Sequence, residues 1–202
     1  MPEVARTVWT NRLKWIGNIV PTLFMLPLVC WGIAWMVNND AILGKGLWLV
    51  VAGVVLGWIS LNLFGLPANA FMRRELKREL TAQGVTFDDP HYFVGFASPR
   101  FFNMLDAHED IGFLVLRDGV LEFAGERHRM KVPRREVQRV RFRPNVHTWV
   151  GLGRWISIDC LRDAKRYRLN VESREHNFLL MNLVASKAMK RAIQDWLRAS
   201  AS

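Results

Sequence analysis

The chain has 202 residues, half of them hydrophobic, and a formal net charge of +10 at pH 7. Its length leaves room for one compact domain beside any membrane segments but not for two, and its two cysteines argue against a disulfide-bonded secreted scaffold. A basic balance of this size favours anionic partners such as lipid headgroups or nucleic acid and excludes no fold class.

Two long apolar stretches lie near the N-terminus. Residues 15–37 number 23 and residues 46–72 number 27, and neither stretch contains Asp, Glu, Lys or Arg. Because about 20 helical residues span a bilayer core, we expect transmembrane helices at 15–37 and 46–67. A cleaved signal peptide is the weaker interpretation of the first stretch, since the apolar core of a signal peptide has only about 7 to 15 residues.

The short connection between the two stretches predicts an antiparallel hairpin over residues 15–67. Basic residues flank its outer ends, whereas the turn contains only Lys45; the flanking residues are Arg6, Arg12, Lys14, Arg73, Arg74, Lys77 and Arg78. By the positive-inside rule, the basic segment 1–14 and the C-terminus both lie in the cytoplasm. We therefore expect a multi-pass protein of the inner (plasma) membrane.

Polar and small residues within the stretches are candidates for helix–helix contact. Asn18 and Asn62 would prefer a protein neighbour to lipid, and Gly53 and Gly57 have the spacing of a small-xxx-small pair. These residues motivate an alternative function, in which the chain is an accessory subunit of a transporter or envelope-assembly complex and associates through its helices. Residues 68–84 predict a juxtamembrane helix or linker, either solvated or along the lipid headgroups.

Short alternating runs of apolar residues after Gly84 predict β-strands. Asp118-Gly119 between two apolar runs is a strong hairpin signal, and residues 162–165 predict a second tight turn. The expected strands are 111–117, 120–124, 127–132, 139–143, 154–160 and 167–171. A helix begins near Ser173 as N-cap, with an apolar stripe of Met181, Ala185, Ala188, Met189, Ala192, Ile193 and Trp196.

This order of strands and closing helix resembles a pleckstrin-homology-like domain. The chain is similar in architecture to bacterial membrane proteins in which a two-helix hairpin carries such a domain, on the motifs Asp118-Gly119, Gly125-Glu126, 133–137 and 151–155 and the closing helix. The resemblance implies an α+β fold, with an antiparallel β-barrel or sandwich and a C-terminal helix over 85–202. Phosphoinositide-binding members carry basic residues around a long first hairpin loop, whereas the first predicted loop here is only Asp118-Gly119, so headgroup-specific binding is not implied.

Residues with catalytic or metal-binding chemistry are sparse. The five histidines lack the spacing of a metal motif, and no cofactor is expected. His108-Glu109-Asp110 is the one compact cluster of acid, base and ligand groups, and a polar loop before a strand is the better interpretation of it than a catalytic site. We therefore expect a protein that is not an enzyme.

Two surfaces are candidates for binding. The first is a basic ladder on two predicted strands and the segment between them, and it contains Arg127, Arg129, Lys131, Arg134, Arg135, Arg139, Arg141 and Arg143. If the two strands are neighbours in register, these residues form one positive face. Otherwise they lie on a solvated sheet face and pair with acidic residues. An apolar loop either docks on a partner or the membrane interface, or packs on its own domain, and it contains Val146, Trp149, Val150 and Leu152.

These features predict a membrane-anchored binding or adaptor module. Its domain would meet a protein partner or anionic phospholipid at the cytoplasmic face, and its helices could bind a membrane protein or a second copy of the chain. Nucleic acid is not an expected partner, because no recognition helix or aromatic pair lies in a basic segment.

Overall fold

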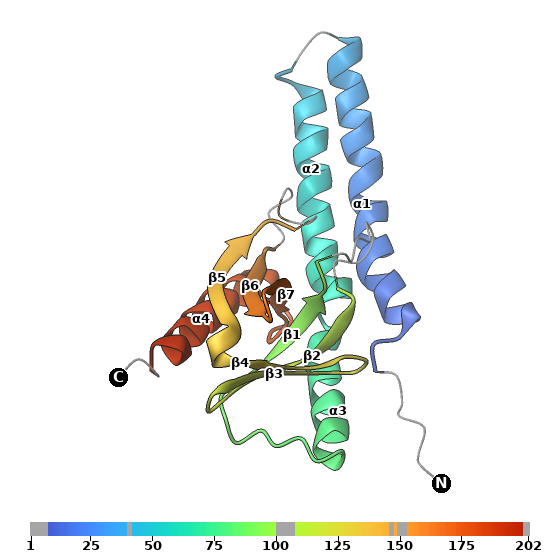
Figure 1. Ribbon diagram of the computed structural model, residues 1–202. Helices are drawn as coiled ribbons and strands as arrows, with labels where there is room; N and C mark the ends of the chain where they lie inside the picture. The colour runs from blue at the N-terminus through green and yellow to red at the C-terminus, as the bar shows by residue number, and fades with distance from the viewer. Residues whose placement is uncertain (1–7, 40–41, 100–107, 146–147, 149–152, 200–202) are drawn as a thin grey trace. The chain divides into compact units, whose positions relative to one another are not determined.

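The computed structural model describes residues 8–39, 42–99, 108–145, 148 and 153–199 (Figure 1). The chain forms two compact units. One is Thr10–Ala68, which is helical, and the other combines Met1–Trp9 with Asn69–Ser202 and contains a seven-stranded antiparallel sheet. The protein is therefore of the predicted α+β class.

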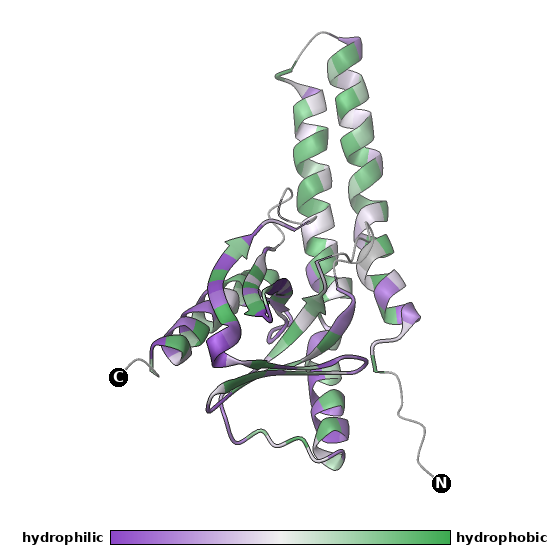
Figure 2. Ribbon diagram, in the orientation of Figure 1, coloured by the Kyte–Doolittle hydropathy of each residue, from purple (hydrophilic) through white to green (hydrophobic). Residues whose placement is uncertain are grey.

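The helical unit is an α-helical hairpin at the predicted positions. Helix α1 is Asn11–Asn38, and helix α2 is Lys45–Ser60, continued by a π-helical turn, η1, over Leu61–Gly65. Helix α1 and the helical segment Lys45–Ala82, which α2 and η1 begin, are long and apolar enough to cross a membrane, and Figure 2 shows hydrophobic residues along most of α1 and α2. They pack most closely at two glycines, since a Cβ atom on Gly32 would lie 2.6 Å from the carbonyl oxygen of Gly46.

The sheet has the strand order β4-β3-β2-β1-β7-β6-β5, and every neighbouring pair is antiparallel. Its strands are β1 His91–Ala97, β2 Asp110–Arg117, β3 Val120–Gly125, β4 Arg129–Pro133, β5 Val137–Arg143, β6 Trp155–Arg162 and β7 Lys165–Ser173. A 3-10 turn, η2, at Arg134–Glu136 joins β4 to β5. Six of these strands lie where the sequence runs predicted them, whereas β1 was not predicted.

Two tight turns contain residues in the left-handed region of backbone conformation. Gly119 has φ 70° between β2 and β3, and Asp163 and Ala164 have φ 48° and 62° between β6 and β7. Both turns were predicted. The first hairpin, however, is β1–β2, because β1 precedes the strand from which the sequence interpretation started. The short loop Asp118-Gly119 belongs to the second hairpin, so the argument drawn from its length does not apply to the first.

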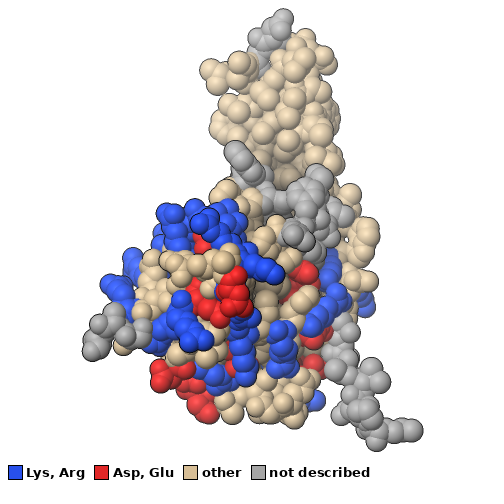
Figure 3. Space-filling view, in the orientation of Figure 1, with Lys and Arg blue, Asp and Glu red and all other residues tan. Residues whose placement is uncertain are grey.

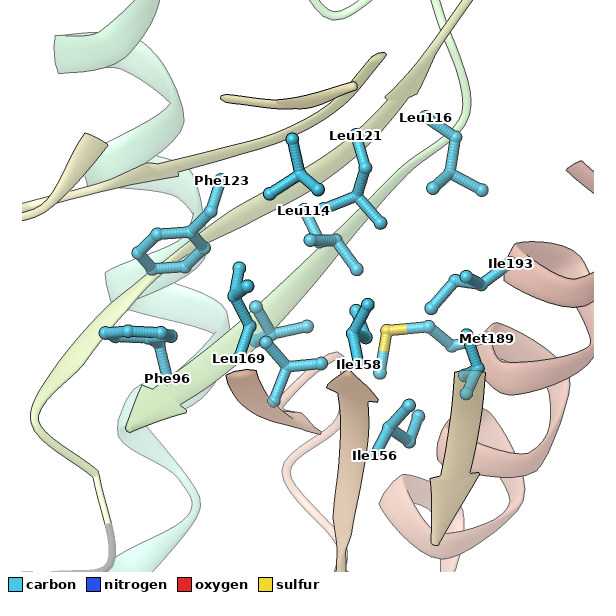
Figure 4. Close-up of a cluster of buried hydrophobic side chains, with 14 of the residues drawn as sticks. Phe96, Leu114, Leu116, Leu121, Phe123, Ile156, Ile158, Leu169, Met189 and Ile193 are labelled. Carbon is cyan, nitrogen blue, oxygen red and sulfur yellow. The ribbon is translucent and has the colours of Figure 1, made fainter. Parts of the chain in front are cut away.

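The inner face of the sheet holds the main hydrophobic core (Figure 4). Helix α4, Leu179–Arg198, contributes Met189 and Ile193, which are fully buried against the strands. The fully buried strand residues around them include Val94, Leu114, Leu121, Phe123, Ile156, Ile158, Leu169 and Val171. These are the inward positions of the alternating runs, which is why the sequence pattern located the strands.

Helix α3, Ala68–Ala82, belongs to the sheet unit rather than to a linker. Met72, Leu76 and Leu80 recur at helical spacing and are each only 1% exposed. On the sheet side, Phe93 of β1 and Phe113 of β2 face away from the main core, yet they are 0% and 1% exposed. The expected solvated or lipid-bound helix over 68–84 is therefore replaced by a helix with one buried face.

Helix α4 begins later than predicted, and its first half buries a different face from the predicted stripe, whereas Met189, Ala192, Ile193 and Trp196 lie in or against the core as predicted. Ser173 ends β7, and the N-cap is Phe178, whose side chain makes no capping hydrogen bond. The buried positions in the first half are Leu179, Asn182 and Ser186, whereas Met181 is 54% exposed. Polar residues turn inward here because they have partners: the side chain of Asn182 bonds the backbone of His176.

Candidate anion-binding face

The predicted basic ladder divides into two groups. Strands β4 and β5 are the two ends of the sheet order and do not pair with each other. The condition for one continuous face is therefore not met, because η2 carries the chain from one edge of the sheet to the other.

The group on β4 and η2 has local partners. Lys131 lies 3.8 Å from Glu122 on the adjacent strand, and Arg129 donates a hydrogen bond to Gln83. The guanidinium of Arg134 stacks 4.5 Å from the centre of the Trp196 ring, and its side chain is only 15% exposed. Arg127 and Arg135 are exposed. These contacts match the alternative of a sheet surface with paired charges.

The group on β5 gathers further arginines from β7. Arg139, Arg141 and Arg143 pair across the sheet with Asp159, Ser157 and Trp155 of β6. Asp159 in turn pairs with Arg168 of β7, and Arg166 is two residues before it on the same side. We call this set the arginine face; it comprises Arg139, Arg141, Arg143, Arg166 and Arg168. Figure 3 shows Lys and Arg concentrated over β5.

Among the ion pairs of the described residues, Asp159 is the one carboxylate that pairs with the arginine face. Asp159 accepts a hydrogen bond from Nε of Arg168 and lies 3.0 Å from Nη2 of Arg141. Burial alone would raise the pKa of Asp159, but the hydrogen bond from Arg168 and the charges of Arg141 and Arg143 lower it overall. Burial, and then repulsion from Arg168 and Arg141, lower the pKa of Arg143. Positive charge is thus in excess here.

Replacing Asp159 with Asn should lower the free energy of unfolding by about 1 kcal/mol at neutral pH, because the ion pairs are lost and the guanidinium groups repel. A lowered pKa in the folded state contributes stability above the ordinary value of about 3.9, and that stability disappears as the pH falls through the folded pKa. The stabilities of the wild type and Asp159→Asn should therefore converge as the pH falls through the lowered pKa of Asp159. Urea unfolding of the detergent-solubilised chain checks this, and a difference that is independent of pH would contradict it.

A second polar cluster fixes the corner where β5 begins. Glu136 accepts hydrogen bonds from the hydroxyl of Tyr167 at 2.6 Å and from Nε of Arg162 at 2.8 Å. The bond from Tyr167 is the largest cause of the lowered pKa of Glu136. Because Tyr167 belongs to β7 and Arg162 to β6, the cluster holds η2 and the start of β5 on the neighbouring strands.

The predicted docking loop, Val146, Trp149, Val150 and Leu152, lies outside the described residues. The residues at its base are described, and Glu172 of β7 binds them. Glu172 accepts hydrogen bonds from the side-chain amide of Asn145 at 3.1 Å and from the backbone N–H of Arg154 at 3.1 Å. Both ends of the loop are therefore attached to the end of β7, next to Arg143 at the end of β5.

The cluster His108-Glu109-Asp110 makes two sets of contacts. Glu109 and Asp110 both approach the ring of His128, at 3.7 and 3.3 Å. His108 lies 3.5 Å from Glu172, whereas Glu109 accepts a hydrogen bond from the backbone of Ser98. Asp110 is fully buried and accepts hydrogen bonds from the backbone of the β3–β4 turn. Asp110 therefore holds the β3–β4 turn, and it shares His128 as a neighbour with Glu109.

The candidate helix–helix contact residues make contacts within the hairpin itself. A Cβ atom on Gly53 would lie 3.0 Å from Leu28, and one on Gly57 would lie 2.8 Å from Met25, so both glycines face α1. The side-chain amide of Asn62 donates to the carbonyl of Trp58 at 2.8 Å, in its own helical segment. The side chain of Asn18 lies outside the described residues. The glycine pair therefore explains packing of the hairpin itself and gives no support to a partner helix.

Arg174, directly after β7, joins the two points at which the chain leaves the sheet unit. Its Nε donates to the side-chain oxygen of Asn69 at 3.0 Å, and its guanidinium lies 5.7 Å from the centre of the Trp9 ring. Trp9 and Asn69 are the residues of this unit that flank the hairpin Thr10–Ala68. Arg174 therefore contacts both residues of the sheet unit that flank the hairpin in the sequence.

No family model and no curated protein matches this chain. What the arginine face can bind therefore follows from its own charges and contacts. Within the part of the chain that the structure describes, no group of three His, Cys, Asp or Glu residues could hold a metal ion. The sequence analysis missed Arg166 and Arg168, although their alternation with Tyr167 and Leu169 places them on the outer side of the predicted strand 167–171.

Proposed function

We propose that the chain is a non-enzymatic, membrane-anchored binding module whose sheet unit engages an anionic lipid surface through the arginine face. The observation that carries the proposal is the crowding of these arginines around a single carboxylate, Asp159. The lowered pKa of Arg143 reflects an unfavourable environment for its charge. Phosphate groups placed over this face would relieve that repulsion, and near an anionic leaflet each Lys or Arg contributes about 1 kcal/mol.

The finer fold and location are part of the same proposal. Strands β1–β4 and β5–β7 each follow one another in the sheet, β1 joins β7, and α4 follows the last strand. This order supports the pleckstrin-homology-like domain that the resemblance implied. The excess of basic residues outside the two apolar helices supports an inner-membrane protein with both termini in the cytoplasm.

The test uses the full chain in phosphatidylcholine nanodiscs fixed to a sensor surface. Vesicles of phosphatidylcholine alone, or with phosphatidylglycerol, flow over it at several salt concentrations. We expect binding of the anionic vesicles only, weakening as salt shortens the screening length from about 10 Å at 0.1 M to about 3 Å at 1 M. The triple change Arg139→Glu, Arg141→Glu and Arg143→Glu should weaken it by at least about tenfold, a loss of about 1.4 kcal/mol.

The other half of the predicted ladder supplies a matched control. Arg127→Glu, Arg129→Glu and Lys131→Glu change the net charge by the same amount at the opposite edge of the sheet. We expect this variant to retain most of the binding and Asp159→Asn to bind more tightly than the wild type. Equal losses in the two triple variants would show that net charge alone acts. No binding of anionic vesicles by the wild type at low salt would overturn the proposal and direct the search to an acidic protein partner.

A further inference from the structure

The first two turns of α4 expose a cluster of large apolar side chains. Phe178 is 62% exposed, Leu180 60%, Met181 54% and Val184 65%. We call these four residues the α4 apolar patch. Within the described part of the sheet unit, Phe71 at 48% and Leu161 at 38% are the other large apolar side chains exposed to this degree. A cluster of exposed apolar side chains at the start of a helix is typical of an interaction site.

The helix cannot rotate to bury this patch, because polar bonds fix its other side. The side-chain oxygen of Asn182 accepts from the backbone N–H of His176 at 2.9 Å, and its amide donates to the carbonyl of His176 at 2.8 Å. Ser186 is 2% exposed and accepts a hydrogen bond from the backbone N–H of Ser173 at 3.3 Å. Turning the helix would leave these buried groups without partners, so the patch is held outward.

The linker before the patch is bonded to the segment that follows the second apolar helix. The side-chain amide of Asn69 donates to the carbonyl of His176 at 2.9 Å, and the backbone N–H of Ala70 donates to the side chain of Asn177 at 3.2 Å. Asn69 follows Leu66, at the end of the densest apolar stretch, by three residues, so at most about 11 Å of chain separates them. The patch begins at the residue after Asn177.

We infer that the α4 apolar patch inserts into the interface of the same bilayer that the hairpin crosses. The inference rests on the membrane anchoring in the proposed function, because the span fixes the depth of Asn69. Apolar side chains of such helices enter about 5 to 10 Å into the boundary between headgroups and acyl chains. Lys187, which is exposed and follows Val184 by three residues, supplies a charge at headgroup level, as at the edges of interfacial helices.

The test places an environment-sensitive fluorophore on a cysteine in the full chain, reconstituted in neutral phosphatidylcholine nanodiscs. Cys30 is replaced by Ser, and Met181→Cys or Val184→Cys receives the label; burial raises the pKa of Cys160 to about 11, so that thiol stays unlabelled at neutral pH. Arg198→Cys, at the far end of the same helix and 77% exposed, is the matched control. Quenching by a nitroxide on shallow acyl-chain positions is compared with quenching by a water-soluble nitroxide.

We expect the labels at 181 and 184 to be quenched several-fold more by the lipid nitroxide than by the aqueous one, with the reverse at 198. If positions 181 and 184 behave like 198, the inference is overturned. A label on the native Cys30, in the middle of α1, then separates the two proposals. Quenching at Cys30 by the lipid nitroxide supports the membrane anchor and overturns only the insertion of the patch. Quenching there by the aqueous nitroxide overturns the membrane anchor as well. Neutral lipid makes every readout independent of the arginine face.

Discussion

A fragment that begins at Gly84 should not fold, whereas a fragment that begins at Asn69 should show a cooperative unfolding transition. The difference between the two fragments is helix α3, with Met72, Leu76 and Leu80 each 1% exposed. Its removal also uncovers Phe93 and Phe113 on the outer face of the sheet. Losing one buried Leu or Met side chain costs about 2 to 5 kcal/mol, so losing all three approaches the whole stability of about 5 to 15 kcal/mol of a small domain.

Circular dichroism and thermal unfolding of the two fragments measure this difference. Both fragments lack Val8 and Trp9, which are buried in the full chain, so the comparison isolates α3. Within the longer fragment, Leu76→Ala should cost about 3 kcal/mol, while Arg74→Ala, on the exposed side of the same helix, should cost less than about 0.5 kcal/mol. A shorter fragment with the same transition as the longer one would contradict the assignment of α3 to the sheet unit.

Replacing Asp110 with Asn should lower the free energy of unfolding of the full chain by about 3 kcal/mol. The carboxylate is 0% exposed and accepts hydrogen bonds from the backbone N–H groups of Ile111, Arg127 and His128 at 2.9, 3.0 and 2.8 Å. An amide of the same shape supplies one acceptor oxygen and points a donor at the remaining N–H groups. A buried donor left without an acceptor costs about 1 to 3 kcal/mol, and loss of the charge weakens the bonds that remain.

Urea unfolding in detergent micelles, followed by tryptophan fluorescence, gives the value. Asp118→Asn is the control, because Asp118 lies on the exposed tip of the β2–β3 hairpin and is 3.8 Å from Arg134. Its change should be within about 0.5 kcal/mol. Since Asp110 binds the turn before β4, its replacement should spare binding of anionic vesicles at β5 in any molecules that remain folded. Equal stability losses in the two variants would mean that the buried carboxylate has no special role.

The sequence predicted the elements whose signals are local. Strands β4 and β7 alternate between more buried and more exposed positions, and β2 and β3 are apolar runs on either side of Asp118-Gly119, the turn that fixes their register. Strand β1 was missed for a physical reason. From Phe93 to Ala97 every residue is buried, so no alternation appears, and β1 lacks the adjacent two-residue turn that revealed the equally buried β2.

The candidate face was predicted only in part, because strand pairing is a long-range property. The alternation of Arg139, Arg141 and Arg143 was visible in the sequence, but nothing local revealed that β5 neighbours β6 rather than β4. The rotation of α4 was equally hidden. Leu179, Leu180 and Met181 are all apolar, and the choice among them depends on the bonds of Asn182 to the backbone of His176 just before the helix, which apolar spacing does not reveal.

The bonds of Arg174 to Asn69 and its contact with Trp9 make the helical hairpin an insertion into a domain whose own ends are already joined. The N-terminal residue Trp9 and the rest of the sheet unit form one body, and the hairpin is a long excursion between them. Domains tolerate insertions where the two ends lie close together at the surface. We therefore expect that the hairpin can be exchanged for another pair of helices, or for a short linker, without changing how the sheet unit is closed.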